Sequence, residues 1–94
     1  MSKKQSDELL IFSLNRKQWD FLKLVDSEIK KRGYPPSIAE LSETMHVSIT
    51  AIVQRIETLI RKDYLVRTRG IARSLTVTPE GKEMIERGNR TIKE

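Results

Sequence analysis

The sequence contains no cysteine, which excludes disulfide bonds, thiolate chemistry and zinc sites built on cysteine. Its single histidine, His46, has no obvious partner for a catalytic or metal site. Gly70 and Gly81 lack the spacing of a loop that cradles phosphates. We therefore expect no catalytic residues, no metal and no cofactor, and a protein that is not an enzyme.

Long apolar runs are also absent. No stretch approaches the roughly 18 apolar residues of a membrane-spanning helix. Leu9 to Leu14 is too short and wrongly flanked for a signal peptide. We expect a cytoplasmic protein with no membrane partner, and the sequence shows no evident small-molecule effector.

Positive charge, by contrast, is plentiful. The chain of 94 residues carries a formal net charge of +5, with 37% hydrophobic and 33% charged residues. This length and composition predict one soluble domain with a modest core. The charge favours an anionic partner, but the placement of the basic residues must decide which one.

An apolar cluster interrupts the polar N-terminal segment, residues 1–13. Such a cluster must pack on something, either the core of its own domain or a second copy of the chain. In the second case the last helix, around Met84 and Ile85, contributes to a homodimer interface. The candidate interface residues are Leu9, Leu10, Ile11, Phe12, Met84 and Ile85.

Two capping boxes predict the first two helices. Asn15 with Gln18 opens a helix that ends at Gly33, and its Asp26 is expected on the solvent face. Ser37 with Glu40 opens a short second helix. Between them, Tyr34-Pro35-Pro36 cannot continue a helix.

A third helix is predicted from Ser48 to Lys62, with an inner stripe of Ile52, Ile56 and Leu59 flanked by Ile49 and Ile60. The apolar period then changes to two, which predicts antiparallel strands over 64–69 and 74–78 around a hairpin loop, 69–73. Thr78-Pro79-Glu80 starts a last helix, which Gly88 is expected to stop.

These elements predict a mainly α fold with a small antiparallel β-hairpin. The class is a winged helix-turn-helix with a three-helix core, a two-stranded wing and a C-terminal helix. We expect the domain to span residues 14–90, with residues 91–94 frayed.

In this arrangement the third helix enters the major groove of duplex DNA. Gln54 is the first candidate for a base contact, because glutamine bonds adenine bidentately. The candidate readers are Ser48, Thr50, Ala51, Val53, Gln54, Arg55, Thr58 and Arg61, with Lys62 beyond them. Taken singly, the polar and basic members of this set equally suit a helix cap, a solvated surface or an interaction with the helix dipole.

The hairpin supplies the second candidate DNA contact. Arg69 and Arg73 flank Gly70, and Arg67 precedes them on the strand, which suits phosphate or minor-groove binding. Exposed arginines would equally protect a sheet edge from aggregation. Ser37, at the N-terminus of the second helix, is a further candidate for a phosphate contact.

The stretch from Leu14 to Leu75 resembles the DNA-binding domain of the LexA repressor family. The likeness rests on Leu14-Asn15, Phe21-Leu22, Gly33-Tyr34-Pro35-Pro36-Ser37, Ala39-Glu40-Leu41 and Arg61-Lys62. It implies that Ser48, Thr50, Ala51, Val53 and Gln54 lie where that family reads the major groove. The continuation, from Leu65-Val66 through Leu75 to Glu83, is similar to MarR-type winged-helix regulators.

Three departures limit what the resemblance implies. His46 and Asp63 stand where glycine is expected, at positions that need positive φ, which both residues tolerate. The third helix lacks the family's Asn and Glu readers, so the operator sequence is not transferred. No protease segment follows, so self-cleavage is not expected.

We therefore expect a sequence-specific double-stranded DNA-binding protein, a homodimeric transcriptional repressor. The alternative is a winged helix used for protein–protein interaction without DNA binding. A protein-docking face should be apolar, whereas the third helix and the hairpin are polar and basic. Double-stranded RNA is disfavoured because its deep major groove does not admit a reading helix.

Overall fold

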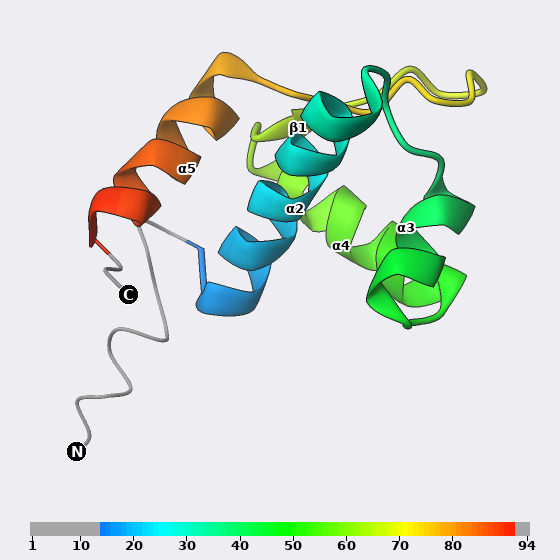
Figure 1. Cartoon of the computed structure of the whole chain (residues 1–94), viewed down its shortest axis with the longest axis horizontal. Helices are drawn as coiled ribbons and strands as arrows, with labels where there is room; N and C mark the ends of the chain where they lie inside the picture. Colours follow the sequence, from blue (N-terminus) through cyan, green and yellow to red (C-terminus); the bar gives the residue numbers. More distant parts are fainter. Residues whose placement is uncertain (1–13, 92–94) are drawn as a thin grey trace.

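The computed structural model describes residues 14–91. In Figure 1, α2 runs through the middle of the molecule, with α5 on one side and α3 and α4 on the other. The hairpin extends away from α5 (Figure 1). This arrangement confirms the predicted winged helix-turn-helix class. The elements are α2 (Arg16–Arg32), α3 (Ile38–Met45), α4 (Ile49–Arg61), β1 (Leu65–Val66), β2 (Thr76–Val77) and α5 (Pro79–Thr91).

Local capping chemistry sets the helix starts where the sequence predicted them. The Asn15 side chain accepts from the Gln18 amide at 2.8 Å, and the Gln18 side chain accepts from the Asn15 amide at 3.1 Å. Ser37 and Glu40 form the same reciprocal pair at the start of α3. Ser48 caps α4 by accepting from the amide of Ala51 at 3.1 Å.

Residues in the left-handed conformation follow the ends of α2, α3 and α4. Two of them, His46 and Asp63, stand where the resemblance predicts glycine. Gly33 has φ 83°, His46 φ 60° and Asp63 φ 68°. His46 and Asp63 therefore adopt the positive φ that was predicted for them. A third such residue, Arg73 with φ 57°, was not foreseen.

The core lies where α2, α3, α4 and the hairpin meet. The largest fully buried side chains include Phe21, Leu22, Leu41, Ile52, Ile56 and Leu59. The predicted inner stripe of α4 is therefore confirmed. No helix in residues 14–91 is long and apolar enough to cross a membrane.

The expected placement of Asp26 was wrong. This residue is 8% exposed, with its carboxylate 3.1 Å from the ammonium of Lys30. Glu28 is 6% exposed and lies 2.9 Å from the guanidinium of Arg32. Buried carboxylates need such partners, and both find them one helical turn further along α2.

The strands are shorter than predicted, with two residues each and Leu65 opposite Val77. Beyond these strands, hydrogen bonds of the Ser74 side chain take the place of backbone hydrogen bonds between strands. Its hydroxyl accepts from the Thr68 amide at 2.9 Å and faces the carbonyls of Thr68 and Ile71 at 3.1 and 2.8 Å. A side chain that bonds the backbone competes with regular pairing, so the hairpin continues as a compact loop.

Helix α5 starts as predicted, with Thr78 accepting from the Gly81 amide at 2.9 Å. The expectation that Gly88 stops it was wrong, because the helix continues to Thr91. Gly88 instead lies against the indole of Trp19, which a Cβ at this position would overlap. The indole nitrogen donates to the Met84 carbonyl at 3.1 Å. The glycine therefore permits close packing of α5 on α2.

We expect Gly88→Ala to destabilise the protein. Overpacking against the fixed indole costs about 1–3 kcal/mol, more than the roughly 1 kcal/mol that alanine adds in a helix interior. The free energy of unfolding, measured in urea, should fall by up to about 2 kcal/mol. The exposed neighbour provides a control, since Asn89→Ala should stay within about 0.5 kcal/mol. A rise in stability for Gly88→Ala would contradict this packing.

Candidate nucleic-acid interface

The turn between α3 and α4 holds the two helices at a defined angle. The Ser42 hydroxyl donates to the Val47 carbonyl at 2.5 Å, and the Val47 amide donates to the Ser42 carbonyl at 3.2 Å. Val47 itself is half-buried against the core. Together with the buried stripe of α4, this turn fixes which face of α4 points outward.

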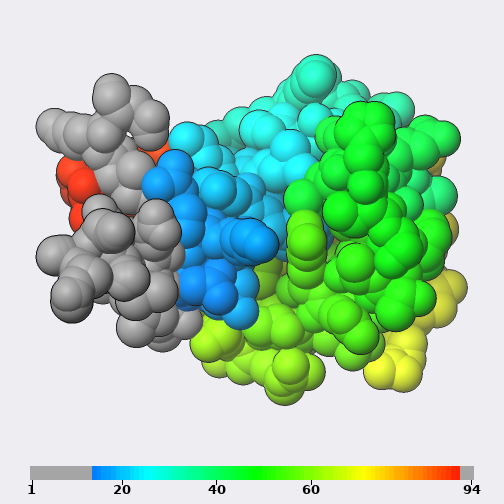
Figure 2. Space-filling model, turned by 90° about the horizontal axis from the view of Figure 1, so that it is seen from below, coloured from blue at the N-terminus to red at the C-terminus, as the bar shows by residue number. Residues whose placement is uncertain are grey.

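That outward face carries most of the predicted readers, and Figure 2 shows it together with the start of α2 and the wing loop. Gln54 and Thr50 are exposed, and no side-chain bond of Gln54 is present in the described part of the chain. Ala51 and Val53 are half-buried between them. The side-chain amide of Gln54 is therefore accessible to an external hydrogen-bond partner.

Two of the predicted readers are occupied by contacts within the protein, Arg55 with α3 and Thr58 within α4. Arg55 is half-buried, with its guanidinium 3.9 Å from the sulfur of Met45. The Thr58 hydroxyl donates to the Gln54 carbonyl at 3.0 Å and lies 3.4 Å from the guanidinium of Arg61. Both side chains are less available to bases than Gln54.

Two residues that lie beside the predicted readers, Ile49 and Gln18, were not among the DNA-contact candidates drawn from the sequence. Ile49 was expected to flank the inner stripe, but it stands at the first turn of α4 and is 48% exposed. Gln18, from the first turn of α2, lines an open groove with Gln54 and Thr58. Helical periodicity cannot show either placement, because both depend on where neighbouring helices end.

Three arginines converge between α4 and the wing. Arg61, Arg67 and Arg69 line an open groove together with Glu57 and Ile60. Within residues 14–91 neither Arg67 nor Arg69 has an acidic partner. Gly70 lies at the exposed tip with φ 82°, a conformation that favours glycine. The groove is therefore open, cationic and of a kind suited to phosphate.

Arg73 has contacts different from those expected of a DNA ligand. Its guanidinium binds the Glu40 carboxylate through two bonds of 2.9 and 2.8 Å, and it donates to the Pro35 carbonyl at 3.3 Å. It also lies 5.1 Å from the centre of the Tyr34 ring. While these contacts hold, Arg73 is not available to a phosphate.

We call the Arg73–Glu40 pair the wing latch. Glu40 also accepts from the Ser37 amide at 3.0 Å and lies 3.2 Å from Arg32. The hydrogen bonds from Arg73 and from the Ser37 amide hold the pKa of Glu40 at about 2, below its ordinary 4.5. The latch thus joins the wing to the start of α3 and the end of α2. Ser37, a predicted phosphate contact, lies beside it as the cap of α3.

The predicted dimer residues fall into two groups. Leu9, Leu10, Ile11 and Phe12 lie outside the described residues. Met84 and Ile85 are buried in the core, 8% and 7% exposed. These two side chains offer little surface to a second copy of the chain.

We expect the wing latch to stabilise the fold near neutral pH and to weaken in acid. A carboxyl whose pKa is lower in the folded state stabilises that state above its unfolded pKa, and the gain is lost as pH falls from about 4.5 toward 2. Glu40→Gln, which can retain the capping box, should melt below the wild type at pH 7. The difference in melting temperature should shrink as pH falls.

Glu43→Gln, on the same helix, provides the matched control and should change the melting temperature little at any pH. A difference between wild type and Glu40→Gln that does not depend on pH would contradict the role of the Glu40 charge.

Comparison with known proteins finds LexA repressors both by family and by individual relatives. The family described as LexA DNA binding domain matches residues 12–74. The LexA repressor of Oleidesulfovibrio alaskensis is 48% identical over 50 residues, which cover 53% of this chain and 24% of the relative. The LexA repressor of Anaeromyxobacter sp. strain Fw109-5 is 30% identical over 79 residues, 83% of this chain and 34% of the relative.

The LexA repressor of Bacillus subtilis is 38% identical over 56 residues, 53% of this chain and 27% of the relative. The chain therefore spans about a quarter to a third of the length of these relatives. The matched range ends at residue 74, within the MarR-like continuation, and that likeness stays a prediction.

Proposed function

Because the chain belongs to the LexA DNA-binding domain family, we propose that it binds double-stranded DNA sequence-specifically and acts as a transcriptional repressor. The observation that carries the proposal is the juxtaposition of the exposed face of α4 with the groove of Arg61, Arg67 and Arg69. A helix in the major groove and a cationic wing beside it would meet one duplex together.

The two surfaces have different roles in this proposal. Gln54 reads a base edge, while the exposed Ile49 and the half-buried Val53 suit the methyl group of thymine. Arg61, Arg67 and Arg69 bind the backbone or the minor groove. Arg73 positions the wing through Glu40 and does not itself contact the duplex.

The alternative of a protein–protein interaction module is less well supported. The surface formed by α4 and the wing is polar and basic, whereas the core of a protein-docking patch is depleted in charge. The names of the relatives, all LexA repressors, also favour repression at DNA.

We expect Arg69→Gln to weaken binding to every duplex by a similar factor. Loss of one phosphate contact should also reduce the slope of log affinity against log salt by about one unit. Fluorescence anisotropy over a salt series measures both quantities. Arg90→Gln, the same substitution on α5, should change neither. An unchanged salt slope for Arg69→Gln would contradict the backbone role.

Gln54→Ala should behave differently. It should relax sequence preference at one base pair, at a cost of about 1–3 kcal/mol for the preferred duplex. Selection of bound duplexes from a random pool, with the wild type and both variants, tests this separation. If Gln54→Ala and Arg69→Gln select the same sequences with the same losses, the assignment of readers and backbone contacts is wrong.

We also propose that the chain acts as a homodimer, with two α4 helices in successive major grooves about 34 Å apart. The apolar residues Leu9 to Phe12 support this proposal, since Met84 and Ile85 are occupied in the core. Sedimentation velocity at micromolar concentration should give twice the chain mass, and the selected duplexes should contain an inverted repeat. A single-chain mass, on and off DNA, would contradict the dimer.

A further inference from the structure

The outward face of α4 carries two rows of different chemistry. Ile49 and Val53 stand four residues apart, as do Thr50 and Gln54, so each pair lies along one side of the helix. Ile49 is 48% exposed and Val53 is half-buried, whereas Thr50 and Gln54 are both exposed. We call the first pair the apolar row and the second pair the polar row.

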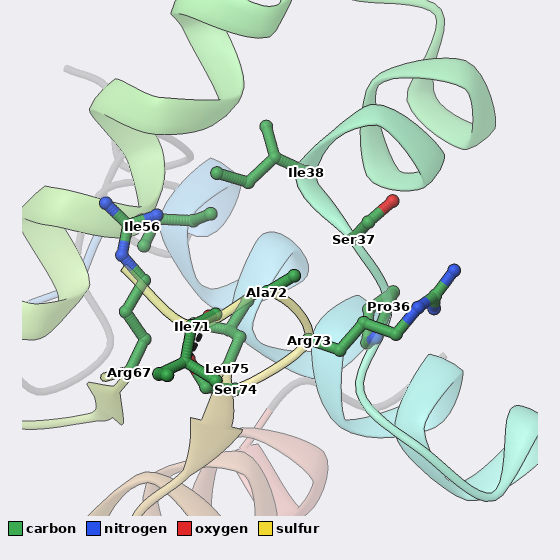
Figure 3. A pocket seen from close by; sticks show the side chains of 10 residues that line it. All are labelled: Pro36, Ser37, Ile38, Ile56, Arg67, Ile71, Ala72, Arg73, Ser74 and Leu75. Carbon is green, nitrogen blue, oxygen red and sulfur yellow. Dashed lines mark hydrogen bonds between the residues drawn. The ribbon is translucent and has the colours of Figure 1, made fainter. Parts of the chain in front are cut away.

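The grooves beside α4 show where each row lies. Gln54 and Gln18 line one groove, so the polar row faces the start of α2. Glu57, one turn beyond the apolar row, lines the other groove together with Arg67. Figure 3 shows the space between the wing loop, the start of α3 and α4, and there Arg67 extends from the hairpin toward Ile56 of α4. The apolar row therefore lies on the side of α4 that faces the wing.

The exposure of Ile49 differs in kind from that of other apolar residues. The large exposed hydrophobic residues within 14–91 are Tyr34, Ile49, Val66 and Ile71. Tyr34 lies against the guanidinium of Arg73, and Val66 and Ile71 belong to the hairpin. Ile49 stands at the first turn of α4, the part of a recognition helix that contacts base edges. Its position favours an apolar group in the major groove, because burial of an apolar side chain is favourable.

The major groove offers one such group, the methyl at C5 of thymine. A 5-methylcytosine carries the same methyl group at the same position of its ring. The side chains of Ile49 and Val53 have no hydrogen-bond donor or acceptor, so neither can distinguish the polar edges of these two bases. An apolar row of this kind detects the methyl group and not the base that carries it.

We propose that Ile49 and Val53 recognise the 5-methyl group of a pyrimidine, whether the base is thymine or 5-methylcytosine. The inference rests on the proposed DNA binding and adds a second specificity contact beside Gln54. It implies that methylation of a cytosine facing the apolar row strengthens binding. Burial of one methyl group corresponds to about a fourfold change in affinity.

Replacement of one thymine at a time by deoxyuridine in a selected duplex tests the contact. Each replacement removes only the methyl group and preserves the base pair with adenine. For at least one thymine, the affinity of the wild-type chain should fall about fourfold, measured by fluorescence anisotropy at constant salt. Equal affinities for the parent duplex and for every substituted duplex would overturn the proposal.

Cytosine and 5-methylcytosine, each paired with guanine at that same position, separate the methyl group from the base. The duplex with 5-methylcytosine should bind about fourfold more tightly than the duplex with cytosine, which is the ratio expected for thymine over uracil. Equal affinities for the two cytosine duplexes would show that the contact depends on thymine itself and would overturn the proposal.

Variants of α4 assign the methyl contact to the apolar row. Ile49→Ala should reduce both ratios, and its combination with Val53→Ala should bring them close to one. Because Ile49 is exposed, Ile49→Ala should melt close to the wild type. Val66→Ala, which shortens an exposed aliphatic side chain on β1, is the matched control and should preserve both ratios. Wild-type ratios in the double variant would assign the methyl contact to other residues and would overturn the proposal.

Failure of this inference is distinct from failure of the proposed function. A chain that selects a duplex sequence but ignores the methyl group retains the proposed function and loses the inference. A chain that binds no duplex loses both.

Discussion

The position of the wing depends on the Glu40 carboxylate. Glu40 caps its own helix through the Ser37 amide, faces Arg32 at the end of α2 and binds Arg73 of the wing loop through two hydrogen bonds. The hairpin has only two paired residues on each strand, so its ladder alone cannot set the direction of the loop. The ionic contact supplies the orientation that a longer sheet would otherwise provide.

This contact also divides the basic residues into two groups. Arg32 and Arg73 are engaged with Glu40 and serve the arrangement of the elements. Arg61, Arg67 and Arg69 border an open groove and remain accessible to an external anion. A net positive charge therefore overstates the number of cations available to DNA, because part of it is already bound within the fold.

The same loop links three features of the molecule. It carries Gly70 at its tip, Arg73 in the latch and the exposed Ile71 between them. Ser74 joins its two sides through backbone contacts. Because these contacts share one short segment, a change at any of them acts on the direction of the wing relative to α4.

The helix starts, the inner stripe of α4, the turn between α3 and α4 and the exposure of Gln54 all follow from the sequence. Each depends on residues within about one or two helical turns of one another, where capping and periodicity act. The tertiary structure alone decided the engagement of Arg73, the packing of Gly88, the burial of Asp26 and the exposure of Ile49. Arg73 and Glu40 are separated by 33 positions, and Gly88 meets Trp19 from the opposite end of the domain. Such contacts form only when distant elements pack together, and no local pattern records which side chains will then meet.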